Sequence, residues 1–270
     1  MTISFRLVPR LAAGLTTLAL AAGAHAHNQW LLPSSTVLSK AAYVTFDGAV
    51  STALFDMDHV PLNTDGLAIV APDGSAAQAE NLQRLKLRTV FDLNLSQPGT
   101  YRVAVVNKGL FASYKDAAGQ TKRWRGSAEA LATAIPANAK DLTVTESQSR
   151  IETFVTLGKP TALKPTNQGL ELVPVTAPSD LAKGERATFA LMLDGQPAAG
   201  VEVAAIRGGA RYRDKVGEIK STTDAAGRFS IVWPESGMYY IEASAKDAKT
   251  TVPQAKERRT LYAATLEVQP

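Results

Sequence analysis

The residues of this sequence best suited to chemistry are two histidines, His27 and His59. Only three histidines occur among the 270 residues, and the third, His25, lies in a segment that we expect to be removed. A histidine at a free N-terminus offers two nitrogens, its α-amine and its ring Nδ1, which can chelate one metal ion together. One further imidazole completes a T-shaped site of three nitrogens, the histidine brace. Such nitrogens suit copper, nickel, cobalt or zinc.

His27 becomes the first residue only if the chain is cut before it, and residues 1–26 have the pattern of a cleavable secretory signal. Arg6 and Arg10 supply the positive start, an apolar run follows, and Ala24-His25-Ala26 is a small-x-small cleavage pattern. The apolar run contains Gly, Thr and many Ala, and it falls short of the ~20 apolar residues that a membrane span needs. We therefore expect export to the periplasm and no stable membrane insertion after cleavage.

A second cleavage pattern overlaps the first, because Ala22-Gly23-Ala24 is also small-x-small. A cut there would expose His25 and leave His27 in third position. That terminus would wrap copper(II) or nickel(II) in a square-planar set of nitrogens without any help from His59. We favour the cut after Ala26, because the apolar residues that begin the first strand follow His27 almost at once.

Three further candidate ligands lie beside His59. Asp56 and Asp58 offer carboxylates, and Met57 offers a thioether that would favour copper. The alternative interpretation is that His59 is an ordinary solvated side chain. The sequence does not show that His27 and His59 meet in space, so both interpretations stay open.

The composition excludes several other classes of function. The formal net charge is +4, and it falls to +2 once Arg6 and Arg10 leave with the signal. So small and scattered an excess of positive charge argues against nucleic-acid binding. Cysteine is absent, which excludes thiolate chemistry and sites ligated by cysteine. With so few histidines, a Ser-His-Asp triad is improbable, and we predict no catalytic residue and no enzyme activity.

The elements that would position these histidines are mostly strands. Alternation of apolar and polar residues predicts a strand over residues 85–95, and the turn at 96–99 leads into a second strand at 100–106, as in a hairpin. A long strand is predicted over residues 143–157. One short helix is predicted near Ser127 to Ile135, with Ser127 as its N-cap.

The stretch Gly158 to Gly169 has the composition of a linker. It predicts two β-sandwich domains, at residues 27–159 and 160–270. The second half has about seven short strands, which is typical of an immunoglobulin-like sandwich. Its phrase from Thr223 to Phe229, followed by Gly237 to Ile241, resembles transthyretin-like β modules.

Several motifs together resemble a family of exported bacterial proteins, domain of unknown function 4198. The resemblance begins with the "H-x-x-W-L-x-P" pattern at His27 and covers essentially the whole chain after the signal. The motifs are residues 27–33, 55–62, 109–114, 122–126 and 211–214. The resemblance implies that the protein is a periplasmic component of cobalt- or nickel-type metal uptake, which would deliver its metal to a membrane transporter.

Three hypotheses follow for the function. The first is a periplasmic protein that binds copper, nickel or cobalt through His27 and His59, for uptake or homeostasis. The second is a copper oxidase or monooxygenase that uses the same brace to activate oxygen. The third is a structural β-sandwich protein without a site, which would be favoured if His59 lay far from His27. We rank them in this order.

Overall fold

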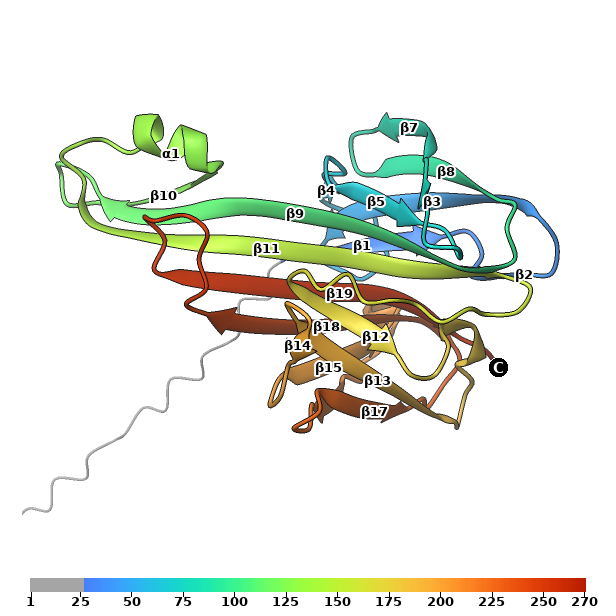
Figure 1. Ribbon diagram of the computed structural model, residues 1–270. Helices are drawn as coiled ribbons and strands as arrows, with labels where there is room; N and C mark the ends of the chain where they lie inside the picture. The colour runs from blue at the N-terminus through green and yellow to red at the C-terminus, as the bar shows by residue number, and fades with distance from the viewer. Residues whose placement is uncertain (1–26) are drawn as a thin grey trace, which may run out of the picture.

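The computed structural model describes residues 27–270, so the predicted signal segment lies outside the described residues. The chain is mostly β, with three sheets and a single α-helix in this part of the chain (Figure 1). This confirms the predicted fold class. No helix among the described residues is long and apolar enough to span a membrane.

The first sheet has five strands and holds both histidines near one end. Its order is β1-β3-β8-β7, and β4 also pairs with β3. The strands are β1 (Asn28–Pro33), β3 (Ala42–Ser51), β4 (Val60–Pro61), β7 (Glu80–Arg84) and β8 (Thr89–Leu95).

The second sheet is the largest and runs through the middle of the molecule. Its order is β16-β15-β18-β19-β11-β9-β5-β6, with β10 beside β9 and β2 beside β11. The strands are β2 (Val37–Leu38), β5 (Leu67–Val70), β6 (Ala76–Ala77), β9 (Gly99–Lys115), β10 (Thr121–Gly126), β11 (Lys140–Leu157), β15 (Glu202–Arg207), β16 (Ile219–Thr222), β18 (Gly237–Asp247) and β19 (Glu257–Val268).

The third sheet has four strands and covers the C-terminal part of the large sheet. They are β12 (Leu170–Pro174), β13 (Arg186–Leu193), β14 (Gln196–Pro197) and β17 (Arg228–Val232). Two short 3-10 helices, η1 (Pro178–Asp180) and η2 (Ala210–Tyr212), lie in connecting loops.

Each outer sheet packs on the large sheet around its own hydrophobic core. The first core joins β1, β3 and β8 to β9 and β11, and it contains Trp30 and the stacked rings of Phe46 and Phe91. The second joins β12, β13 and β17 to β15, β18 and β19 around Phe189 and Trp233. The two β-sandwiches therefore share the middle sheet, in which β11 and β19 pair in parallel. The division near residue 159 stays a prediction.

The segment from 158 to 169, predicted as a linker, contains no strand or helix. It is nevertheless fastened to the middle sheet by buried charges. Arg102 donates to the carbonyl of Lys164 at 2.7 Å, and Arg150 donates to Thr166 at 2.8 Å. Both arginines face Glu152, whose side chain is fully buried. An ionic cluster thus holds this segment against the sheet between the two cores.

The strands β9, β10 and β11 project beyond both sandwiches at one end (Figure 1). We call residues 107–149 the arm. Its helix α1 (Ala128–Ala134) packs Leu131 against Leu110 and Val144 on one face of the arm. The hydroxyl of Ser127 accepts a hydrogen bond from the backbone amide of Ala130, which confirms the predicted helix and its N-cap.

The predicted strand over residues 85–95 is wrong in its first part. The amide of Leu85 donates to the carbonyl of Arg88 at 2.9 Å, which closes a turn, and β8 begins only at Thr89. The side chains of Leu85 and Leu87 are exposed, so the alternation through this turn does not reflect burial. The predicted hairpin is also wrong, because β8 and β9 belong to different sheets.

Candidate functional site

The topology of the first sheet brings the two histidines to the same end of β3. His27 directly precedes β1, whose Asn28 pairs with Ser51, and His59 directly precedes β4, whose Val60 pairs with Val50. Because β1 lies on one side of β3 and β4 on the other, the two histidines flank the end of that strand. Neighbouring strands lie about 4.8 Å apart, so β1 and β4 are separated by roughly twice that distance, which two side chains that extend toward each other past the end of β3 can bridge.

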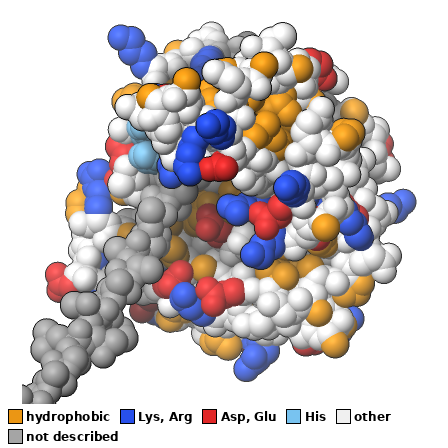
Figure 2. All heavy atoms as spheres, turned by 90° about the vertical axis from the view of Figure 1, so that its left-hand side faces the viewer, with side chains coloured by type: hydrophobic (Ala, Val, Ile, Leu, Met, Phe, Trp, Pro, Cys, Tyr) orange, Lys and Arg blue, Asp and Glu red, His pale blue; other side chains and the backbone are white. Residues whose placement is uncertain are grey.

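The imidazole rings of His27 and His59 stack on one another. Their centroids are 3.9 Å apart and their planes differ by 7°. Both side chains are exposed, and Figure 2 shows histidine atoms on the surface of the face that looks along the arm. The structure thus brings together the two histidines that the sequence singled out.

The stacked arrangement does not aim both rings at one point. A metal ion bound through a ring nitrogen lies near the plane of that ring, about 2.0–2.1 Å from the nitrogen. Two parallel, stacked planes cannot both contain the same ion, so one ring must turn before both bind it. Exposed side chains exchange rotamers readily, and the arrangement therefore fits a shared ion after a side-chain rotation.

The loop from Thr52 to His59 is held firmly to the end of β3. Asp58 accepts hydrogen bonds from the amide of Thr52 at 2.9 Å and from that of Ala53 at 3.3 Å. The Thr52 bond is the main cause that lowers the pKa of Asp58, and the nearby His27 adds a smaller effect. Asp58 therefore stays ionised beside the histidine pair and helps to fix the loop that carries His59.

The other two candidate helpers have partners of their own. Asp56 forms a 2.8 Å ion pair with Arg211, which joins the first sheet's loop to the second sandwich. The thioether sulfur of Met57 lies 3.3 Å from a guanidinium nitrogen of Arg88 and packs against the first core. Within residues 27–270, no group of three or more His, Cys, Asp or Glu side chains is arranged to hold a metal.

A notch of about 620 Å³ opens beside His59, and it was not predicted from the sequence. Its charged side chains are Arg84 of β7, Lys108 of β9 and Arg125 of β10. It is also lined by Gln29, Val50, Val60, Pro61, Asn63, Asn107, Gly109 and Gly126. Lys108 and Arg125 stand on the consecutive strands β9 and β10, whereas Arg84 comes from β7 in the other sheet, so the fold brings the three cations together.

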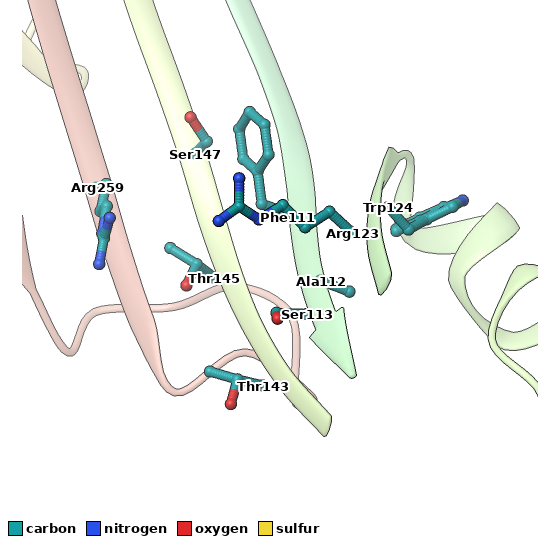
Figure 3. Close-up of a pocket in the computed structure, with 9 residues that line it drawn as sticks. All are labelled: Phe111, Ala112, Ser113, Arg123, Trp124, Thr143, Thr145, Ser147 and Arg259. Carbon is teal, nitrogen blue, oxygen red and sulfur yellow. The ribbon is translucent and has the colours of Figure 1, made fainter. Parts of the chain in front are cut away.

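A second cavity of about 440 Å³ lies on the arm, on the face opposite α1 (Figure 3). Its floor carries Phe111 and a row of hydroxyls from β11, and Arg123 reaches over it, whereas Trp124 points toward the helix. Phe111 also supports the guanidinium of Arg125, 5.0 Å above its ring. The cavity on the arm therefore adjoins the notch beside His59.

Fold and site together define a class: a double β-sandwich protein with an exposed pair of histidines at the end of one strand. The chain belongs to the family described as "Domain of unknown function (DUF4198)", whose model matches residues 24–247. This confirms the family predicted from the motifs. No curated protein matches the chain.

Similarity to solved structures is weak. The chain is 11% identical to Escherichia coli alpha-2-macroglobulin activated by porcine elastase, with 90% of this chain and 31% of that chain covered and a TM-score of 0.23. For the D0-D1 domain of Intimin the identity is 10%, the covered shares are 89% and 97%, and the TM-score is 0.23. For the FN1-FN3 domains of chicken CNTN1 the values are 7%, 91%, 99% and 0.23.

Proposed function

We propose that this chain is a periplasmic protein that binds a divalent transition metal as its cargo, for uptake or homeostasis. The metal is copper, nickel or cobalt, and its ligands are the α-amine and ring of His27 together with the ring of His59. The observation that carries the proposal is the 3.9 Å contact between the two rings. The structural hypothesis would be favoured if His59 lay far from His27, and their ring centroids are instead 3.9 Å apart.

The positions of the three additional candidate ligands beside His59 support a site whose ligands are mainly nitrogen atoms. Asp56 and Met57 already contact Arg211 and Arg88, so neither is a ready ligand in this arrangement. Asp58 lies close enough to His27 to influence the local charge and would partly balance a bound dication. Nitrogen ligands favour copper and nickel over the hard cations magnesium and calcium.

The same proposal includes the location and the partner. The signal pattern of residues 1–26 would deliver the chain to the periplasm and, on cleavage, create the terminal amine of His27. A membrane metal transporter is the partner that this role requires. Because the ligands are exposed, the metal could pass to such a partner without unfolding of the sandwich.

Metal titration of the processed protein tests the proposal. The protein is purified from the periplasm, its first residue is fixed by intact mass, and copper(II), nickel(II) and cobalt(II) are titrated by calorimetry. We expect His59→Ala, and separately one glycine added before His27, each to weaken binding at least about tenfold, or 1.4 kcal/mol. Asn28→Ala, next to His27 on β1, is the matched control and should bind as wild type does.

Two results would count against the site. If His59→Ala binds all three metals as tightly as wild type, His59 is not a ligand. If the added glycine leaves the affinity unchanged, the terminal amine is not a ligand. A mature chain that begins at His25 would instead indicate a local site at the terminus.

A further inference from the structure

The notch beside His59 is lined by three cations and by no carboxylate. The cations are Arg84, Lys108 and Arg125. Among residues 27–270 none of these three cations forms an ion pair, whereas Arg88 and Arg211 nearby both do. All three side chains are exposed, so their charges are available to a ligand from solution.

Contacts within the protein already fix part of the notch in place before any ligand binds. Arg125 lies over the ring of Phe111, 5.0 Å from its centroid, which limits the conformations of its guanidinium. Asn107 donates to the carbonyl of Asn63 at 3.1 Å and so ties β9 to the loop after β4. The walls of the notch are therefore connected to one another across two sheets.

This charge has a consequence for the proposed metal site. A dication at His59 would be repelled by these three cations and attracted by the single carboxylate of Asp58, so the repulsion is only partly balanced. The brace supplies only three nitrogens, and the described side chains offer no further cluster of ligands. An anion that contacts both the cations and the metal would remove the repulsion and complete the coordination.

We propose that the notch binds a small polycarboxylate anion, of the tricarboxylate class that citrate represents, and that this anion accompanies the metal. Guanidinium groups bind carboxylates in a bidentate fork, and carboxylate oxygens also ligate divalent metals. The volume of about 620 Å³ is some twenty times the ~30 Å³ that one water occupies. A single phosphate would leave most of it empty, whereas several carboxylates on one carbon chain can reach cations from three strands. The inference about the metal rests on the function proposed above.

Calorimetric titration of the processed protein with citrate, first without metal, tests the notch directly. We expect citrate to bind, and the triple variant Arg84→Gln, Lys108→Gln, Arg125→Gln to bind it at least tenfold more weakly. Arg186→Gln is the matched control, because Arg186 is an exposed arginine on β13 in the other sandwich. Melting curves check that the triple variant is folded, as expected for exposed side chains.

A second titration adds nickel(II) or copper(II) at saturation. The metal should tighten citrate binding in wild type and not in His59→Ala. Equal citrate affinity of wild type and the triple variant would overturn the notch, and inorganic phosphate that binds as tightly as citrate would overturn the polycarboxylate assignment. If no metal binds at all, the proposed function fails, while the metal-free titration still decides on the notch.

Discussion

Replacing Glu152 by glutamine should destabilise the whole fold, because this residue neutralises two buried arginines. Its side chain is fully buried, 2.9 Å from Nε of Arg102 and 3.7 Å from a nitrogen of Arg150, and it accepts a 2.7 Å hydrogen bond from Tyr262. Burial raises the pKa of Glu152, while the two arginines and the Tyr262 hydroxyl oppose that effect. Glutamine keeps the shape and can still accept from Tyr262, and it then turns its amide NH2 toward the arginines, so the variant removes both the charge and the acceptor that they face.

The structure sets the size of the effect. In the variant, Arg102 and Arg150 would face a single buried acid, Glu171, which lies 4.0 Å from Arg102. A unit-charge pair at 4 Å is worth about 4 kcal/mol at an effective dielectric constant of ~20, and the saved desolvation of the carboxylate offsets part of the loss. The contact between Arg102 Nε and Glu152 is close but lacks hydrogen-bond geometry, which lowers its value. We expect a loss of about 3 kcal/mol in the free energy of unfolding.

Urea unfolding followed by circular dichroism measures this loss. Glu257→Gln is the control, because Glu257 pairs with Arg259 at the surface, and an exposed pair contributes little to stability. The double variant Arg102→Met, Glu152→Gln restores the balance of one cation to one acid, so its loss should fall short of the sum of the single losses by at least about 1 kcal/mol. A Glu152→Gln loss no larger than that of the control, or strict additivity, would refute the argument.

Three other outcomes follow from single contacts. Asp194→Asn should cost about 1.5 kcal/mol at pH 7 by calorimetric melting, because Arg258 lowers the pKa of Asp194. The stabilisation that comes with this lowered pKa is present above pH 3.8, the ordinary pKa of the side chain, and is lost as the pH falls below it. The stability of the variant should therefore change less between pH 4 and pH 2 than that of wild type. Leu131→Ala should expose the arm to hydrogen exchange, at a cost of about 2 kcal/mol, since Leu131 is buried in the small cluster under α1. Arg211→Ala should change the free energy of unfolding no more than the Glu257→Gln control does, because the pair of Arg211 with Asp56 is largely exposed, and a larger loss would mean that this pair holds the two sandwiches together.

The sequence predicted those parts of the fold in which local pattern and burial agree. The helix after Ser127 agrees within a residue, and the strand predicted over residues 143–157 corresponds to β11 (Lys140–Leu157), because capping and alternation report local structure directly. The strand over residues 85–95 failed because the leucines at 85 and 87 continue the alternation by chance through an exposed turn. Nor does alternation say which sheet a strand joins, and so the hairpin of β8 with β9 was mispredicted.

In the candidate site too, the sequence predicted which residues matter but not how they are placed in space. Scarcity was enough to select His27 and His59, because few histidines leave few alternatives. Their contact depends on β1 and β4 both pairing with the end of β3, and such long-range pairing has no local signal. The cations of the notch could not be predicted as a group, because Lys108 and Arg125 stand on the β9–β10 hairpin and Arg84 stands on β7 in another sheet, and such contact between sheets has no local signal.

These placements connect the site to the stability of the first sandwich. His27, whose α-amine the proposed cleavage would free, is followed at once by β1, in which Trp30 is fully buried and donates to Ser51 at the end of β3. That hydroxyl in turn donates to Ala53, in the loop that leads to His59. A metal held between His27 and His59 would join the two strands that flank β3, so its binding energy would also resist fraying of β1. A site of this kind needs the folded sandwich, which a flexible terminal chelate would not.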